Sequence, residues 1–203
     1  MSSTAEAPVD EPIYNIRGEK VALGPIRRDL IPVYQRWIND LVTVRNIDMI
    51  PRPMSLEQET GWYESAIADR NGSLFTIYEL SSGVPIGNTH IFDVDYYHRH
   101  ATFGILIGEP SMRGKGYGTE TTKLMLDYAF TVLGLNNVML TVAAFNIGGI
   151  RAYQKAGFRE IGRRRSSRNV AGQLWDTIYM DCLAEEFESP VLRRIFAIDE
   201  AAG

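Results

Sequence analysis

The stretch that decides the fold reads Arg113-Gly114-Lys115-Gly116-Tyr117-Gly118-Thr119. It stands between a β-rich run at residues 101–108 and an amphipathic segment at residues 119–133. Its glycines allow backbone angles that other residues avoid. At the start of a helix, such a turn aims several free N–H groups at one point, where the helix dipole favours negative charge. The stretch therefore predicts a cradle for a phosphate or pyrophosphate, to which Arg113 and Lys115 add positive charge. A flexible connecting turn is the alternative.

Two common phosphate-binding loops do not fit these residues. The phosphate loop of nucleotide hydrolases needs Gly-Lys followed by Ser or Thr, whereas Gly116 follows Lys115. The dinucleotide fingerprint needs its third glycine farther along and an acidic residue at the end of a second parallel strand. The turn therefore indicates an anion site of another kind.

The hydrophobic period changes along the chain in a clear order. Two helical segments come first, with Asp29 as the expected cap of one and Ser55 with Gln58 as a capping box for the other. Three β-rich runs divided by turn residues follow, and they predict an antiparallel meander. After the glycine turn and its helix come a strand, a helix and a closing hairpin. This order predicts the α+β class with a mixed central sheet.

The composition excludes several classes of protein. The chain has 203 residues, 45% hydrophobic and 23% charged, which fits one domain whose core needs no metal or disulfide. A net charge of −4 argues against a nucleic-acid partner, and no apolar run approaches the ~20 residues of a membrane span. The single cysteine, Cys182, cannot form an internal disulfide, and the N-terminus shows no secretory signal. We therefore expect a soluble, cytoplasmic protein without membrane partners.

Two motifs in the second half of the chain resemble a known enzyme family. The Arg-x-x-Gly-x-Gly pattern at residues 113–118 resembles the acetyl-CoA pyrophosphate motif of the GNAT superfamily of N-acetyltransferases. Residues 146–158 resemble the Asn…Tyr-x-x-x-Gly-Phe stretch of the same family, with the spacing kept. The stretch around the turn, at residues 105–120, resembles the branch that includes ribosomal-protein-alanine and spermidine acetyltransferases. The family resemblance extends from about Val21 to Leu183.

The resemblance implies a GNAT-like single domain with a mixed, mostly antiparallel central sheet, splayed parallel strands and flanking helices. We expect a disordered lead at residues 1–16, the acetyltransferase domain at 17–184 and a helical tail at 185–203. The tail would either cover the protein's own surface or form a homodimer contact. Its apolar helical face consists of Val191, Leu192, Ile195 and Phe196.

The resemblance also implies how acetyl-CoA, the co-substrate, is held between the two splayed strands. Its pantetheine arm would meet the backbone of Leu106, Ile107 and Gly108, and Asn146 would steady it from the neighbouring strand. A backbone N–H near Ile107 would polarise the thioester carbonyl. The pyrophosphate would meet the amides of Arg113, Gly114, Lys115, Gly116, Tyr117, Gly118 and Thr119.

In the implied reaction, a neutral amine attacks the thioester carbon and CoA leaves as a thiolate. Tyr153 matches the family tyrosine that protonates this thiolate, so we expect it to be the general acid; an aromatic side chain that only packs in the core is the alternative. Many relatives carry a glutamate where this chain has Thr102, and threonine is not a useful base. Water, Glu109, Asp93 or His90 would then accept the amine proton.

Two clusters of side chains have simpler explanations than a binding site. His90, His98 and His100 lie close in sequence, but no cysteine or acidic partner stands at a zinc-binding spacing. We therefore expect no metal and place these histidines on a surface hairpin. The basic run Arg163–Arg168 predicts a solvated hairpin loop, unless it meets the 3′-phosphate of CoA or an acidic partner.

The acceptor pocket of the family lies between the first two helices and the late hairpin. In this chain the region includes Trp37, Asn46, Asp48, Met49, Arg52, Trp62, Tyr63 and Trp175. The connection between these two helices, IDMIPRPMS at residues 47–55, has one Asp and no carboxylate cluster. Because a polycationic substrate needs several carboxylates, this argues against spermidine. A small-molecule amine or a peptide N-terminus fits as the acceptor. A CoA-binding module without catalysis and an interaction protein are the alternatives to an N-acetyltransferase.

Overall fold

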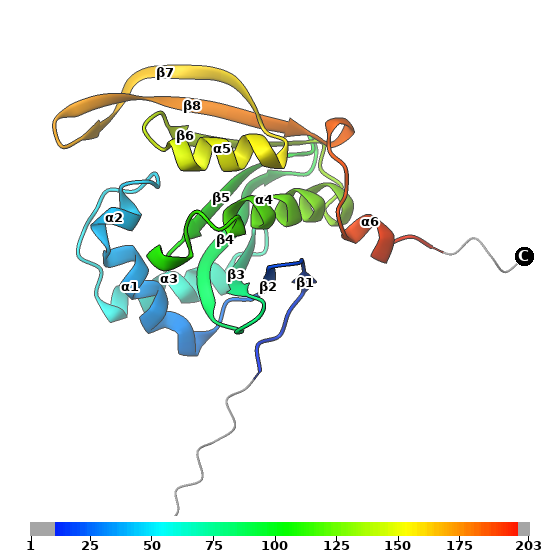
Figure 1. Ribbon diagram of the computed structural model, residues 1–203. Helices are drawn as coiled ribbons and strands as arrows, with labels where there is room; N and C mark the ends of the chain where they lie inside the picture. Colours follow the sequence, from blue (N-terminus) through cyan, green and yellow to red (C-terminus); the bar gives the residue numbers. More distant parts are fainter. Residues whose placement is uncertain (1–10, 199–203) are drawn as a thin grey trace, which may run out of the picture.

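The structure is a computed structural model that describes residues 11–198 (Figure 1). Its strands span Ile16–Arg17 (β1), Val21–Pro25 (β2), Ser73–Glu79 (β3), Pro85–Asp95 (β4), His100–Ile107 (β5), Asn137–Ala143 (β6), Arg159–Val170 (β7) and Gln173–Leu183 (β8). They form one sheet in the order β1-β2-β3-β4-β5-β6-β8-β7. All neighbours are antiparallel except β5 and β6, which run parallel. The predicted α+β class, the mixed sheet and the meander are confirmed.

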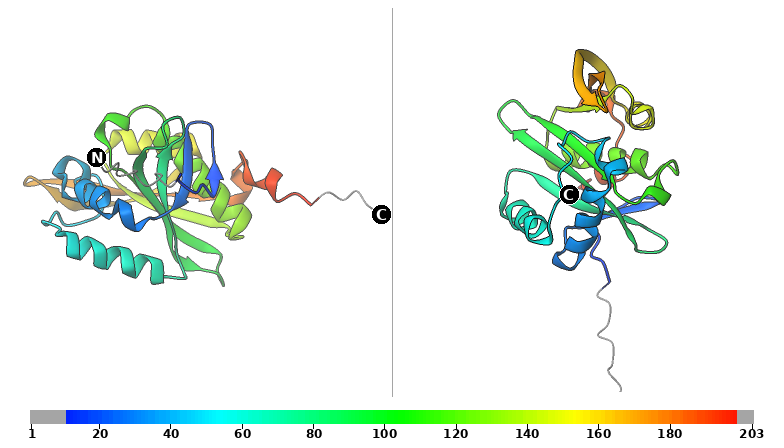
Figure 2. Two further views of the ribbon diagram at one scale, coloured as in Figure 1. Left: turned by 90° about the horizontal axis from the view of Figure 1, so that it is seen from below. Right: turned by 90° about the vertical axis from the view of Figure 1, so that its left-hand side faces the viewer.

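Helices cover both faces of this sheet. They span Arg28–Leu30 (η1), Ile31–Asn39 (α1), Leu41–Val44 (α2), Leu56–Ala68 (α3), Pro110–Met112 (η2), Tyr117–Asp127 (α4), Tyr128–Val132 (η3, a π-helical turn), Ile147–Ala156 (α5), Ala184–Glu186 (η4) and Leu192–Ile195 (α6). Helices α1 and α3 lie on one face, and α4 and α5 lie on the other (Figure 2). None of the helices in residues 11–198 has the length and apolar character that a bilayer crossing needs.

The main core lies between the sheet and α4. Ile77, Ile91 and Val138 point from the strands toward Leu124 and Met125, and all five side chains are buried. Burying a side chain of this size stabilises the fold by roughly 1.5–3 kcal/mol. The packing therefore holds the N-terminus of α4 close to the end of β5, where the glycine turn lies.

The parallel pair β5–β6 separates soon after it forms. Its pairing covers three residue pairs, from His100–Asn137 to Thr102–Met139. Beyond them β5 continues along β4, and β6 continues along β8, so each strand keeps only its outer neighbour. The inner edges of the two strands consequently diverge, and the predicted splay is confirmed.

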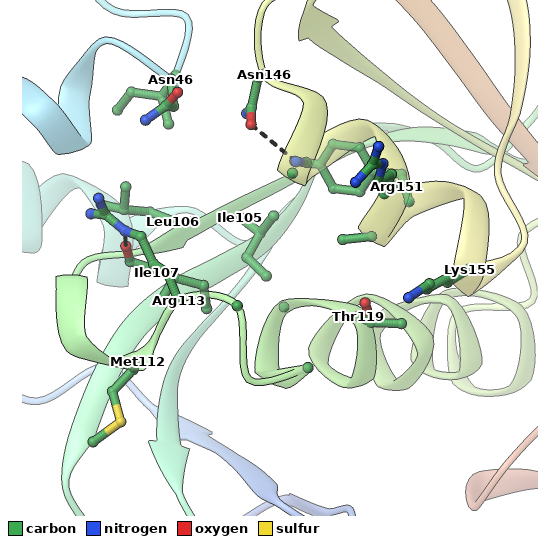
Figure 3. Close-up of a pocket in the computed structure, with 18 of the residues that line it drawn as sticks. Asn46, Ile105, Leu106, Ile107, Met112, Arg113, Thr119, Asn146, Arg151 and Lys155 are labelled. Carbon is green, nitrogen blue, oxygen red and sulfur yellow. Dashed lines mark hydrogen bonds between the residues drawn. The ribbon is translucent and has the colours of Figure 1, made fainter.

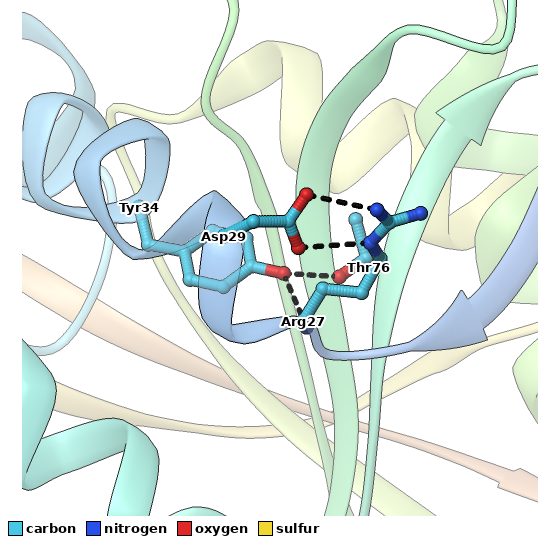
Figure 4. Close-up of polar contacts among 4 residues, drawn as sticks. All are labelled: Arg27, Asp29, Tyr34 and Thr76. Atoms are coloured by element: carbon cyan, nitrogen blue, oxygen red, sulfur yellow. Dashed lines mark hydrogen bonds and ion pairs between the residues drawn. The ribbon is translucent and has the colours of Figure 1, made fainter. Parts of the chain in front are cut away.

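The first helical segment is anchored differently from the prediction. Asp29 is not its N-cap, because the carboxylate of Asp29 pairs with the Arg27 guanidinium, with 2.8 Å between Oδ2 and Nη2 (Figure 4). This pair lowers the pKa of Asp29. The Tyr34 hydroxyl lies 2.6 Å from Thr76 Oγ1 and accepts a bond from the Arg27 amide, which ties α1 to β3. The predicted capping box of Ser55 and Gln58 is present at the start of α3.

The two predicted end segments fall partly outside the described residues, which begin at 11 and end at 198. In the predicted lead, Ile16 is buried and pairs with Leu23, so the chain joins the sheet one residue earlier than expected. In the predicted tail, α6 is only four residues long. Its residue Leu192 is buried, whereas Ile195 and Phe196 are exposed, so the predicted apolar face is divided.

A buried carboxylate ties the tail to the domain. Asp127 accepts bonds from the backbone N–H groups of Val191 and Leu192 and from the Ser189 hydroxyl, at 2.6–2.9 Å. The Thr131 hydroxyl donates a fourth bond at 2.9 Å. A carboxylate that accepts bonds in this way satisfies the free N–H groups at the start of α6. At least the first part of the tail therefore packs on its own domain.

Candidate active site

The gap between the diverging strands contains a cavity of about 490 Å³ (Figure 3). It extends from the end of β5 across the glycine turn to the first two turns of α5. Predicted cofactor residues line much of it: Leu106, Ile107, Arg113, Gly114, Gly116, Gly118, Thr119 and Asn146. Tyr153 lines it as well. The fold thus brings two segments about 30 residues apart in the sequence to one opening.

The glycine turn has the backbone conformation that its sequence predicts. Gly114 and Gly116 have φ angles of +75° and +91°, in the left-handed region that favours glycine. Gly116 is the N-cap of α4, and no side chain caps this helix. The first N–H groups of α4 therefore face the cavity without a side-chain partner, next to the positive end of the helix dipole.

The charge of the cavity is positive. Arg113, Arg151 and Lys155 line it, and none of the described lining residues is acidic. Arg151 and Lys155 project from α5 toward the opening, with Lys155 directed at Thr119 on the opposite side (Figure 3). Sequence reasoning missed these two residues, although their spacing of four places them on one face of a helix. A polyanionic ligand fits this cavity.

The side chain of Arg113 joins the turn to its surroundings. Its Nε donates to the carbonyl oxygen of Ile107 at 3.1 Å, and its Nη2 donates to the Thr43 hydroxyl on α2. The Thr43 hydroxyl in turn donates to Asp40. Arg113 therefore holds the end of β5 and the start of the turn in place, and its charge remains on the cavity wall.

Three of the predicted cofactor residues do not line the cavity. The amide of Gly108 donates to the Ile86 carbonyl at 2.9 Å, and a Cβ on Gly108 would lie 2.2 Å from the ring of Trp37. Glycine is thus needed there because a tryptophan packs on the backbone. Lys115 is exposed, and Tyr117 packs against the hydrophobic core.

The backbone of β5 offers only every second amide to the gap. The Gly108 amide donates to the Ile86 carbonyl next to β4. In an antiparallel ladder the amides of every second residue point to the same neighbouring strand, so the Leu106 amide points to Asn88 on β4. The Ile107 amide then points to the opposite side, where β6 has separated. Among the amides of Leu106, Ile107 and Gly108, that of Ile107 is therefore the one directed into the gap.

Asn146 caps the N-terminus of α5. Its Oδ1 accepts a bond from the Gly149 amide at 3.0 Å and so caps the helix (Figure 3). This bond uses the side-chain oxygen and orients α5, which carries Tyr153 and the two cations. Asn146 nevertheless remains part of the cavity wall.

A second cavity, of about 410 Å³, lies on the other face of the sheet, under α1 and α3. Of the residues predicted for the acceptor pocket, Trp37, Asn46, Asp48, Met49 and Trp62 line it. Arg52, Tyr63 and Trp175 do not. Sequence reasoning missed several lining residues, including Glu59, Asn88, Phe92 and Arg168. They come from α3, β4 and β7, and no local pattern relates them.

Tyr153 lies where the two cavities meet. It lines both of them, as do Asn46 and Leu106. Its ring packs edge-on against Phe103 and Phe158, at centroid distances of 6.3 and 6.1 Å. Within residues 11–198 no group forms a hydrogen bond with its hydroxyl, and burial raises the pKa of Tyr153 to about 12. The phenol therefore keeps its proton at neutral pH.

The predicted bases have different surroundings. His90 lines the second cavity, whereas Glu109 pairs with Arg36 at 3.3 Å and Asp93 lies in a bulge of β4 with a φ of +50°. The prediction of a surface position is wrong for His90, because its ring lies over Gly104 in the sheet. Burial lowers the pKa of His90, which keeps it neutral.

The other two histidines do lie at a turn. His98 and His100 are exposed next to each other, with ring centroids 6.2 Å apart. In the described part of the chain, no three metal-binding side chains come together.

The basic run is not a loop. Its residues belong to strand β7, and the hairpin turn comes later, at Ala171 and Gly172. Arg163 pairs with Glu160. Arg168 is largely buried and donates to the Ile47 carbonyl at 3.0 Å, so it reaches into the second cavity. The strand continues through this run because β7 is the outermost strand and its charged side chains reach solvent.

Comparison with known proteins identifies the domain. A family model for the acetyltransferase (GNAT) domain matches residues 20–159. The chain belongs to the GNAT acetyltransferase family. It is therefore an N-acetyltransferase that transfers an acetyl group from acetyl-CoA to an amine, as the sequence motifs predicted.

Similar proteins share most of this GNAT domain. The chain is 33% identical to a spermidine N(1)-acetyltransferase of Escherichia coli (strain K12), over 79% of this chain and 84% of that one. It is 29% identical to the human α/β-tubulin-N-acetyltransferase 9, over 71% and 74% of the two chains. A crystal structure of a Vibrio cholerae spermidine N-acetyltransferase in complex with CoA and spermine matches with a TM-score of 0.76 and 25% identity, over 82% and 97%.

Proposed function

We propose that this GNAT enzyme acetylates a small-molecule primary amine held in the second cavity, with Tyr153 as the general acid. The position of Tyr153 carries the proposal, because it lines both cavities and its hydroxyl has no partner in the described chain. A donor at this junction can reach the sulfur that leaves the thioester while an amine approaches from the other side.

Acetyl-CoA binds in the first cavity. The amides at the start of α4 hold its pyrophosphate, and the charges of Arg151 and Lys155 attract its phosphates. The pantetheine arm runs along the free edge of β5, where the Ile107 N–H donates to the thioester carbonyl. The absence of acidic side chains among the described lining residues supports this assignment.

The acetyl transfer proceeds by direct attack. The amine nitrogen forms a bond with the carbonyl carbon, and the Ile107 N–H stabilises the resulting oxyanion. The C–S bond then breaks, and the Tyr153 hydroxyl donates its proton toward the departing sulfur. The amine proton passes to solvent by way of His90, whose neutral ring lines the second cavity.

The size of the second cavity, about 410 Å³, supports a small acceptor. Helices α1 and α3 cover it from above the sheet, and Arg168 holds the segment at Ile47 and Asp48 against it. A peptide N-terminus is the second candidate, because one relative is named as an acetyltransferase of tubulin.

An acetyl-CoA titration and an acceptor panel test the proposal. Calorimetry should detect acetyl-CoA binding to the purified protein. A thiol-release assay should then show turnover with small primary amines, in a panel of spermidine, an aminoglycoside, 2-phenylethylamine and short peptides that begin with Ala or Ser. Binding without turnover of any amine would make the protein a CoA-binding module. Turnover of the peptides alone would move the acceptor to protein N-termini.

We further propose that the enzyme works in the cytoplasm and that residues 17–184 are the acetyltransferase domain. Limited proteolysis of the full chain should leave a stable fragment that contains these residues, and cell fractionation should recover the protein with the cytosol. A homodimer contact through the exposed Ile195 and Phe196 is tested by light scattering of the full chain.

A further inference from the structure

Glu59 is a buried carboxylate that the fold itself does not explain. It lies on the face of α3 that covers the second cavity, it lines that cavity, and only 5% of its surface is exposed. Among residues 11–198, no donor forms a hydrogen bond with its carboxylate and no cation pairs with it, so burial raises the pKa of Glu59. Buried charges without partners are costly, and natural proteins pair them or use them.

The other charged side chains of this cavity already compensate one another. Arg168 lies 3.2 Å from the Asp48 carboxylate and also donates to the Ile47 carbonyl. Asp48 is largely exposed at the rim, with 80% of its side chain accessible. His90 is kept neutral by burial. One negative charge, that of Glu59, is therefore left for a ligand inside the cavity.

Much of the remaining wall is apolar and aromatic. The aromatic side chains that line it are Tyr34, Trp37, Trp62, Phe92, Phe103 and Tyr153. Met49 and Met54 add flexible apolar surface. Such a wall suits a hydrophobic or aromatic body, and the rings also attract a cation placed against their faces.

Three polar atoms of this wall are buried without partners in the described chain. They are Trp37 Nε1, Asn88 Oδ1 and Arg168 Nε. The Asn88 oxygen can accept a hydrogen bond from an ammonium group bound in the cavity.

We propose that the acceptor is a monocationic primary amine with an apolar, aromatic body, and that Glu59 binds its ammonium group. This inference rests on the proposed function and specifies the chemistry of the acceptor. Spermidine would bring three cationic groups to a cavity with one uncompensated carboxylate, and its further charges would lose hydration without gaining a partner. An aralkylamine such as 2-phenylethylamine matches both the single charge and the aromatic wall.

A binding experiment separates this inference from the catalytic proposal. Trp37 and Trp62 line the cavity, so amine binding to the CoA-loaded protein can be followed by tryptophan fluorescence without any turnover. The probes are 2-phenylethylamine and spermidine. The variants are Glu59→Gln, which removes the charge and keeps the shape, and Glu57→Gln, an exposed position on the same helix, as the matched control.

The wild type should bind 2-phenylethylamine at least tenfold more tightly than spermidine. Glu59→Gln should weaken that binding about 10- to 100-fold, as expected for a lost charge-assisted hydrogen bond, and leave acetyl-CoA binding unchanged. Glu57→Gln should bind as the wild type does. Tighter binding of spermidine, or unchanged binding in Glu59→Gln, would overturn the inference. Normal amine binding without acetyl transfer would count against the proposed function instead.

Discussion

Replacing Tyr153 with phenylalanine tests the proton-donor role most directly, because it removes one hydroxyl and keeps the ring. The ring packs against Phe103 and Phe158, and phenylalanine can keep both contacts. The hydroxyl has no partner in the described chain whose loss would disturb the fold. A lower kcat in Tyr153→Phe would therefore come from the lost hydroxyl and not from a disturbed fold.

The size of the expected effect follows from the pKa values of the Tyr153 hydroxyl and of the CoA thiol. The pKa of Tyr153 is about 12, whereas an alkyl thiol has a pKa of about 8.5. Complete transfer of the proton from this phenol to a free thiolate is therefore uphill by roughly 5 kcal/mol. As the general acid, Tyr153 then shares its proton with the sulfur through a hydrogen bond while the negative charge develops, and CoA leaves as a thiolate. A hydrogen bond to a charged group contributes about 1.5–3 kcal/mol, which corresponds to a kcat roughly 10- to 150-fold lower in Tyr153→Phe.

The assay follows CoA thiol release at saturating acetyl-CoA and amine, with acetyl-CoA affinity measured separately by calorimetry. Tyr128→Phe is the matched control, because it also removes a phenol hydroxyl, one that bonds Ser73 away from both cavities. Its kcat should equal that of the wild type. A wild-type kcat in Tyr153→Phe, or a loss explained by weaker acetyl-CoA binding, would refute the role of Tyr153.

Three other substitutions test separate parts of the structure. Gly116→Ala places a side chain at a φ of +91°, which costs about 1–2 kcal/mol, and calorimetry should show acetyl-CoA binding roughly 5- to 30-fold weaker. Gly61→Ala, in open space on α3, should leave that affinity unchanged. Asp127→Ala leaves the N–H groups of the tail without an acceptor, and urea unfolding should show a loss of roughly 2–6 kcal/mol. Glu59→Gln should be more stable than the wild type at pH 7. The pKa of Glu59 in the folded protein is raised above 4.5, so the carboxylate takes up its proton as the pH falls and the cost of its buried charge disappears. Thermal unfolding should therefore show the advantage of Glu59→Gln decreasing toward pH 4.5 and absent below it. An advantage that persists at pH 4 would contradict the burial argument.

Much of the first cavity could be predicted because its determinants are close together in the sequence. Gly114 and Gly116 adopt left-handed angles within the turn itself, and the start of α4 follows at once. Positive φ angles and free helix N–H groups depend on the local chain alone. Gly108 and Lys115 do not line the cavity, since whether a residue faces the gap depends on what packs beside it. Trp37, more than 70 positions earlier, determines the glycine at 108.

The second cavity could be predicted only in part. Its aromatic residues on α1 and α3 follow the helical period, and Trp37 and Trp62 line the cavity. Arg168 was expected in a solvated loop, yet the pairing of β7 with β8 turns it toward Ile47. His90 was expected at the surface, yet the pairing of β4 with β5 places its ring over Gly104.

The sequence by itself determined the family, the order of strands and helices, and the glycine turn before α4. These depend on hydrophobic periodicity and on the backbone preferences of neighbouring residues. Only the tertiary structure decided that Glu59 is buried without a partner and that Tyr153 lies between two cavities. Burial and charge compensation are properties of the space around a side chain, and that space is enclosed by residues from distant parts of the chain.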